Sequence, residues 1–124
     1  MSFLDKILGK TSTPESSPDF WKYIESEADL EKAIAESSER KVAIFKHSTR
    51  CHISKTVLRN FEREVQESPA DVSYYFLDLL EYRPVSNKIE HDLDVVHQSP
   101  QLIVLKDGRA VNNMSHQGIS IKGI

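Results

Sequence analysis

The spacing of apolar residues alternates along the chain between two patterns, and each change marks another predicted element. Four apolar runs are rich in aromatic and β-branched side chains, which predicts strands. Between them, apolar residues recur every three or four positions, which is the spacing of one helix face. The predicted strands are residues 20–24, 41–46, 72–77 and 102–105, and the predicted helices are residues 27–37, 52–68 and 83–93.

The run at residues 41–46 is almost continuously apolar, as in a strand that is buried on both faces of a sheet. Helices between the first four strands imply parallel crossover connections. Asp107 and Gly108 can supply the positive φ angles of a tight turn, so residues 110–114 should return as an antiparallel edge strand. We therefore predict an α/β domain with a mixed sheet of about five strands and flanking helices.

The first 19 residues differ in composition from the rest of the chain. Residues 11–19 contain two prolines and several hydroxyl side chains, which is typical of a linker. Apolar residues at positions 3, 4, 7 and 8 are spaced for a short amphipathic helix on the domain or on a membrane surface. A loosely held terminal segment is the alternative. We predict a terminal segment and linker over residues 1–19 and one domain over residues 20–124.

Composition argues against several classes of protein. The 124 residues suffice for one domain, and the net charge of -3 provides no broad attraction to nucleic acid. The N-terminal apolar positions are too few for a membrane span or a secretory signal. One cysteine cannot form an internal disulfide, which fits a reducing cytoplasm. The cysteine and five histidines show no recognised zinc spacing, so no metal site is predicted.

Cys51 is the strongest candidate for chemistry. It stands between the strand predicted at residues 41–46 and the helix that begins near His52, and Ser48 or Thr49 is the expected helix cap. Unpaired N–H groups and the dipole at a helix N-terminus favour the thiolate, which is the nucleophilic form of cysteine. The position of Cys51 therefore predicts an exposed and activated sulfur.

Each neighbour of Cys51 allows two interpretations. Arg50 would stabilise the thiolate if it faces the sulfur, and otherwise it is a solvated turn residue. His52 would act similarly when protonated or would donate a hydrogen bond, and otherwise it is an exposed residue of the first helical turn. Ser54 would hydrogen-bond the thiolate or cap the helix, and His47 is expected to be structural.

The order of these elements resembles the thioredoxin fold over about residues 20–119. Cys51 follows a buried strand and opens a helix, where that superfamily carries its Cys-x-x-Cys motif. The next strand ends in the acidic Asp78, and Ser99-Pro100 precedes an apolar strand, where the fold has a cis-proline beside the reactive cysteine. More closely, FKHSTRCHIS at residues 45–54 and HQSPQLI at residues 97–103 are similar to the active-site segments of YtxJ-like monothiol bacilliredoxins.

The resemblance implies thiol–disulfide exchange on proteins that carry bacillithiol, a small bacterial thiol, as a mixed disulfide. Cys51 would be the nucleophile. A cysteine at position 54 could resolve the mixed disulfide from within the chain, but Ser54 cannot, so an external thiol must release it. The residues implied in supporting the thiolate are Thr49, Arg50, His52 and Ser54, and those implied in binding substrate are Gln98, Ser99 and Pro100.

Two departures from the resemblance affect what it implies. His52 occupies a position that is often proline in such motifs, which would alter the thiol pKa or the preference among thiols. Residues 120–124 are too few for the terminal helix that a thioredoxin-type domain usually adds. We therefore predict a short or missing C-terminal helix and a sheet face that is less covered than usual.

The expected partners are a small thiol and client proteins with mixed disulfides. Bacillithiol would be the co-substrate, no cofactor would be tightly bound, and the location would be a bacterial cytoplasm. One alternative is a thioredoxin-like module that binds proteins or senses redox state without catalysis. Another is an iron–sulfur carrier of the monothiol glutaredoxin type, in which two chains and two external thiols ligate one cluster.

Overall fold

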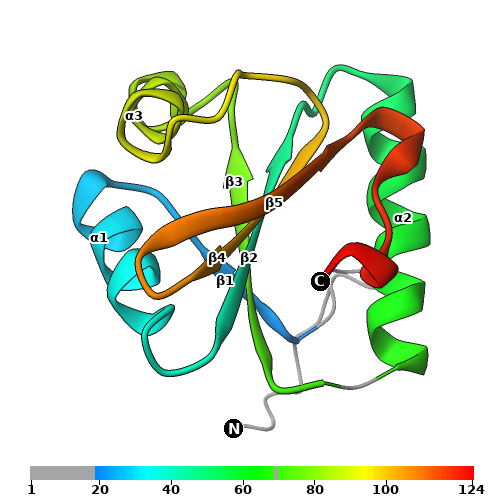
Figure 1. Ribbon diagram of the computed structural model, residues 1–124. Coiled ribbons are helices and arrows are strands. Elements are labelled where there is room, and N and C mark those ends of the chain that lie inside the picture. Colours follow the sequence, from blue (N-terminus) through cyan, green and yellow to red (C-terminus); the bar gives the residue numbers. More distant parts are fainter. Residues whose placement is uncertain (1–18, 69) are drawn as a thin grey trace, which may run out of the picture.

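The computed structural model describes residues 19–68 and 70–124. Nearly all of the predicted N-terminal segment and linker, residues 1–18, lies outside the described residues, so its amphipathic pattern stays a prediction. The described chain forms one mixed sheet that has α1 and α3 on one face and α2 on the other (Figure 1). The predicted fold class is therefore confirmed.

The observed elements follow the predicted order closely. The strands are β1 (Trp21–Tyr23), β2 (Lys41–His47), β3 (Val72–Asp78), β4 (Gln101–Lys106) and β5 (Arg109–Ser115). The helices are α1 (Glu27–Glu36), α2 (His52–Glu67) and α3 (Arg83–Leu93), followed by the 3₁₀ helices η2 (His116–Gly118) and η3 (Ile121–Gly123). The two short turns η2 and η3 lie beside α2 (Figure 1). They take the place of a longer terminal helix, as the prediction of a short or missing C-terminal helix expects. None of the helices in the described ranges is long and apolar enough to cross a membrane.

The direction of β4 differs from the prediction. The strand order is β1-β3-β2-β4-β5, with β1, β3 and β2 parallel but β4 antiparallel to β2. A parallel crossover would have required α3 to return the chain to the opposite end of the sheet. Instead, β4 begins at the end where β3 stops, because Gln101 pairs with Lys46 near the carboxyl end of β2. Element order alone does not distinguish the two paths, since a helix of this length can follow either.

Two local signals in the sequence have the structural effect that they predict. Ser26 caps α1, and its hydroxyl accepts a hydrogen bond from Asp29 N at 3.1 Å. Asp107 and Gly108 adopt φ values of 54° and 79° and form the tight turn between β4 and β5. The backbone N–H groups of both turn residues donate to Ser37 at the end of α1, which anchors the hairpin.

The two faces of β2 bury different cores. Val42 and Ile44 pack with side chains of α1 and α3, whereas Ala43 and Phe45 pack with Phe61 and other side chains of α2. All four of these β2 side chains are fully buried. Burial of a large apolar side chain contributes about 1.5–3 kcal/mol, so the central strand stabilises both layers at once. It also holds the segment that follows it, where Cys51 lies.

Polar contacts of unusual density hold the end of α1 against the sheet. Glu36 accepts hydrogen bonds from Ser73, Tyr75, Arg40 and Lys22. Burial alone would raise the pKa of Glu36, but these hydrogen bonds, led by that of Ser73, outweigh it and lower the pKa to about 2. The carboxylate therefore stays charged throughout the neutral range.

A second polar contact joins β1 to α2. The indole Nε1 of Trp21 donates a hydrogen bond to Glu62 Oε2 at 2.7 Å. Burial raises the pKa of Glu62, while this hydrogen bond and the charge of Arg59 partly lower it. Trp21 is the only tryptophan in the chain, so it can report on the protonation of this carboxyl.

Candidate active site

Cys51 stands at the first position before α2 and is partly exposed, with no disulfide partner. Its backbone is extended, with φ of -102° and ψ of 121°. The turn that places it there is closed by a hydrogen bond of 3.2 Å from Cys51 N to Ser48 O. The N-cap residue of α2 is Cys51 itself, and its side chain makes no capping hydrogen bond, so the predicted capping by Ser48 or Thr49 is wrong. Among the residues that the structure describes, no side chain occupies the first-turn amides, which can therefore stabilise a sulfur anion.

Ser54, one turn after Cys51, joins the first turn of α2 to the segment that precedes the cysteine. Ser54 is fully buried, and its hydroxyl oxygen accepts a hydrogen bond from Ser48 N at 3.1 Å. The same oxygen lies 2.7 Å from His47 Nδ1. A hydroxyl that accepts from Ser48 still has its own proton to donate to a neutral imidazole. Ser54 thus ties the end of β2 to the first turn of α2, and its contact with the thiolate stays a prediction.

His47 has the structural environment that the sequence suggests. It is buried, and its ring packs against Phe76 with the centroids 5.5 Å apart and the planes tilted by 49°. Burial lowers the pKa of His47, while the charge of Asp78 opposes this effect and that of Lys55 adds to it. Asp78 lies opposite His47 in the β2–β3 register, and its carboxylate accepts backbone hydrogen bonds from the turn after β3.

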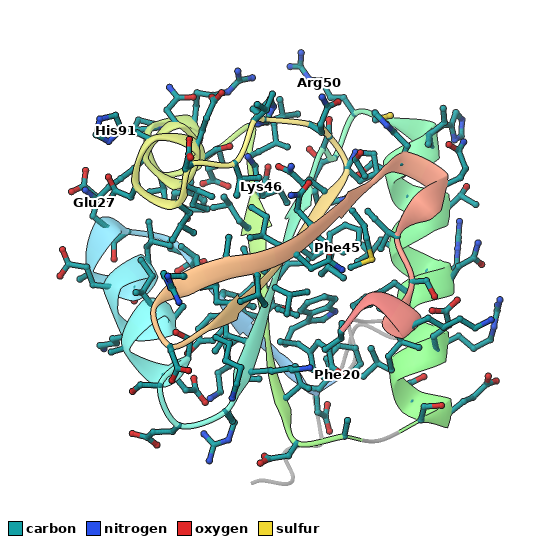
Figure 2. All side chains as sticks on the ribbon, viewed as in Figure 1. Phe20, Glu27, Phe45, Lys46, Arg50 and His91 are labelled. Atoms are coloured by element: carbon teal, nitrogen blue, oxygen red, sulfur yellow. The ribbon has the colours of Figure 1, made fainter. Side chains whose placement is uncertain are left out.

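The remaining residues around Cys51 lie on the outside of the molecule. Thr49, Arg50 and His52 are exposed, and Figure 2 shows Arg50 extending from the upper end of the fold into solvent. Within the described ranges, the Arg50 side chain makes neither a hydrogen bond nor an ion pair, so it is free to turn toward a bound anion. The structure brings these residues to one end of the sheet, and their support of the thiolate stays a prediction.

The predicted substrate-binding segment lies at the same end of the sheet. The Ser99–Pro100 peptide bond is cis, as the resemblance implies. Pro100 is buried, and its carbonyl oxygen accepts a hydrogen bond of 3.0 Å from His116 N. Lys46, near the end of β2, pairs with Gln101 at the start of β4. The Cys51 turn, which follows β2, and the segment that precedes β4 therefore lie at the same end of two neighbouring strands.

Gln101 holds the loop that precedes the cis-proline. Its side chain is fully buried; Nε2 donates to Val96 O at 2.9 Å, and Oε1 accepts from Gln98 N at 3.3 Å. Gln98 is therefore positioned through its backbone, while its own side chain is exposed. Sequence reasoning missed the role of Gln101, although a glutamine at the start of an apolar strand was a signal for a buried polar contact.

Lys46 is a second residue that sequence reasoning missed. It is fully buried, and its Nζ has no hydrogen-bond partner within the described ranges. Figure 2 places Lys46 in the interior, on the side of the sheet that α3 covers. Burial lowers the pKa of Lys46 to about 8, with an opposing effect from Glu90 and a further lowering from Arg83. A charged residue inside the apolar run of β2 was the signal for this feature.

An open groove of about 410 Å³ lies along α2, and its lining includes His52, the residue that follows Cys51 in the chain. One wall is the flank of α2 that carries His52, Thr56 and Asn60, and the other wall includes Gln117 and Ile119 from the segment after β5. Sequence reasoning placed only His52 near the site. The spacing of positions 52, 56 and 60 along one helix flank was the available signal for the first wall.

Within residues 19–68 and 70–124, no three His, Cys, Asp or Glu side chains form a group that could hold a metal ion. The arrangement around Cys51 suits thiol chemistry, because the partly exposed cysteine lies at a helix N-terminus, at the same end of the sheet as the cis-proline segment.

Comparison with known proteins agrees with this geometry. A protein described as a candidate oxidoreductase with a thioredoxin fold has a TM-score of 0.73 and 28% identity, over 83% of this chain and 88% of the other. Thioredoxin from Fasciola hepatica has a TM-score of 0.65 and 23% identity, over 77% and 86% of the two chains. Thioredoxin NaTrxh from Nicotiana alata has a TM-score of 0.67 and 17% identity, over 88% of each chain. The two thioredoxins show the shared fold.

The family comparison is more specific than these structural likenesses. The family model described as monothiol bacilliredoxin BrxC matches residues 22–124, which include Cys51, Ser54 and the cis-Pro100 segment. Together with the oxidoreductase likeness, this match supports a thiol redox function. The chain therefore belongs to the monothiol bacilliredoxin family.

Proposed function

We propose that this protein is a thiol–disulfide oxidoreductase that removes bacillithiol, or the equivalent small thiol of its host, from protein mixed disulfides. The observation that carries the proposal is the partly exposed Cys51 at the start of α2, with Ser54 in place of a second cysteine one turn later. Membership of the monothiol bacilliredoxin family supports the choice of thiol.

The reaction has two exchange steps. In the first, the Cys51 thiolate attacks the small-thiol sulfur of the client mixed disulfide, a bond forms between these two sulfurs, and the client sulfur leaves as a thiolate that takes up a proton. In the second, an external thiolate attacks the small-thiol sulfur on Cys51. The products are a disulfide between the external thiol and the small thiol, and the regenerated Cys51 thiolate.

Each surrounding residue has a role that follows from its position. The first-turn amides of α2 stabilise the Cys51 thiolate, and the exposed Arg50, together with His52 when it is protonated, adds positive charge on turning toward it. The backbone near Ser99 pairs with an extended client segment beside Pro100. The need for an external reduced thiol agrees with the reducing cytoplasm that the single cysteine predicts.

The test is the intact mass of the protein after it is mixed with a bacillithiolated model protein and then with free bacillithiol. We expect one small-thiol adduct on the wild type, its disappearance after free thiol is added, and a matching amount of reduced client. Cys51→Ser should form no adduct. If the wild type also forms none at any pH between 6 and 9, the protein is a binding module and the proposal is wrong.

A further inference from the structure

Lys46 and Gln101 are neighbouring side chains in the layer between the sheet and α3. They lie directly opposite each other in the antiparallel register of β2 and β4. Opposite residues of such a pair project from the same face of a sheet, with Cβ atoms about 4.5–5.5 Å apart. Both side chains are fully buried, and Figure 2 shows Lys46 in the interior. Because Gln101 bonds the loop before β4 at Val96 and Gln98, a buried amine lies beside the side chain that holds this loop.

The other groups around Lys46 come from α3 and from the loop itself. Burial lowers the pKa of Lys46, with Glu90 opposing this effect and Arg83 adding to it. Burial and then the charge of Lys46 lower the pKa of His97, which is half-buried in the loop. Ser86 lies between Arg83 and Glu90 at helical spacing and is fully buried. Its hydroxyl and the Lys46 amine both lack a hydrogen-bond partner in the described ranges, although native proteins contain few such buried groups.

A packing role does not account for an amine at this position. An apolar side chain would fill the same space in β2 without the cost of removing a charge from water. Departures of this kind from the apolar pattern of a core are concentrated at functional sites, where activity needs a group that stability does not. The candidate client-binding segment, Ser99–Pro100, immediately precedes Gln101. In an interior of low dielectric constant, a charge orients nearby backbone dipoles more strongly than it does in water.

We propose that Lys46 is a positioning residue for the client protein: its charge, together with the hydrogen bonds of Gln101, fixes the loop so that the Ser99 backbone is oriented to pair with an extended client segment. This inference rests on the proposed function, because it requires a polypeptide client beside Pro100. It assigns Lys46 to the recognition of the polypeptide and not to the exchange of sulfur at Cys51. A disulfide that lacks a polypeptide should therefore react equally well without the amine.

Two substrates separate recognition from chemistry. Each is a mixed disulfide of bacillithiol, and its other half is either the cysteine of a short blocked peptide without ionisable side chains or N-acetylcysteine amide. In both, the Cys51 thiolate attacks the bacillithiol sulfur, a cysteine thiolate leaves and takes up a proton, and the adduct on Cys51 is measured by intact mass after acid quenching. Single-turnover rates at varied concentrations give the maximal rate and the half-saturating concentration of the peptide. The ratio of the second-order rate constants, peptide over amide, isolates the contribution of the polypeptide.

The variant Lys46→Met removes the amine with little change of shape. We expect it to raise the half-saturating concentration of the peptide by roughly tenfold, in line with the loss of one charge-assisted contact. The maximal rate and the reaction of the amide should stay unchanged. Ser86→Ala is the matched control, because it removes the other buried polar group of the same layer that lacks a partner in the described ranges, but no charge. Its ratio should equal that of the wild type.

A pH profile tests the charge without a variant. Because the pKa of Lys46 is about 8, the peptide-to-amide ratio of the wild type should fall as the pH rises from 7 to 9.5. The ratio of Lys46→Met should stay constant over this range. The ionisation of Cys51 affects both substrates equally and cancels in the ratio. Burial and the charges of Lys46 and Arg83 lower the pKa of His97, so this residue is already neutral across the window.

Each other result overturns the assignment for a different reason. An equal ratio in the wild type and in Lys46→Met would show that the amine has no part in binding the peptide. A ratio that falls in Ser86→Ala as well would attribute the effect to packing under the loop. A ratio that falls in Lys46→Met but does not depend on pH in the wild type would attribute it to shape and not to charge. If the wild type forms no adduct with either disulfide, the proposed function itself fails.

Discussion

Replacement of Lys46 by methionine should stabilise the protein. Lys46 is fully buried in β2, and its amine has no hydrogen-bond partner within the described ranges. Methionine has a similar unbranched shape and is fully apolar, so Lys46→Met removes the amine without opening a large cavity. The groups that act on this amine are Glu90 and Arg83 on α3 and His97 in the loop before β4.

The magnitude follows from the pKa. Burial lowers the pKa of Lys46 from 10.5 to about 8. A difference of this size corresponds to about 3 kcal/mol of free energy. Below pH 8 both the folded and the unfolded chain hold the proton, so the full cost is present. Between pH 8 and 10.5 the unfolded chain binds more protons than the folded chain, so the stability of the wild type rises across this window.

The assay is urea unfolding followed by Trp21 fluorescence and by circular dichroism between pH 7 and 10.5. At pH 7, Lys46→Met should have a free energy of unfolding about 3 kcal/mol above that of the wild type, and this difference should shrink toward pH 10.5. Lys106→Met is the control, because Lys106 is exposed at the end of β4, and its stability should stay close to that of the wild type. Tyrosine ionisation affects all three proteins equally and cancels in the differences.

Two results would refute this reasoning. A Lys46→Met protein that is less stable than the wild type at pH 7 would show that the amine has a favourable partner. A stability difference that does not depend on pH between 7 and 10.5 would show that the cost of burying the charge is not what separates the two proteins.

Other contacts in the structure lead to further measurable outcomes. Ser54→Cys places a second thiol one helical turn after Cys51, so the variant should lose its small-thiol adduct without added thiol; an adduct that persists by intact mass would contradict this. Glu36→Gln should lower the free energy of unfolding at pH 7 by about 3 kcal/mol, since the folded carboxyl has a pKa of about 2 rather than 4.5. That loss should fade as the pH falls from 4.5 toward 2, which urea titrations can follow, and a pH-independent loss would argue against it. The fluorescence of Trp21 should change as Glu62 is protonated, with a midpoint above 4.5, because burial raises the pKa of this carboxyl. Glu62→Gln should abolish that change, and a transition that survives in it would have another source.

Local patterns in the sequence were sufficient for most of the secondary structure. The continuous apolar run of β2 indicated a strand with both faces covered, and the structure places it in the middle of the sheet. The Ser26 cap and the Asp107–Gly108 turn depend on backbone conformations of neighbouring residues, so they can be read from short segments. The direction of β4 could not be read in this way, because it depends on which end of the sheet α3 returns to.

The candidate site also combines features that the sequence predicted with contacts that it did not. Cys51 at a helix N-terminus and Ser54 one turn later are consequences of sequence order, and the resemblance to monothiol bacilliredoxins added the cis-Pro100 segment. The partners of Ser54 were not predicted, because hydrogen bonds depend on distances of a fraction of an ångström between side chains.

The sequence by itself determined the order of the elements, the single nucleophile and the absence of an internal resolving thiol. These properties follow from residue identity and from interactions within a few positions of the chain. Only the tertiary structure decided that Lys46 would be buried with no partner among the described residues, and that Gln117 and Ile119 would face α2 across a groove. Those features arise where segments that are distant in the sequence pack together, and a local pattern carries no information about which distant segments come into contact.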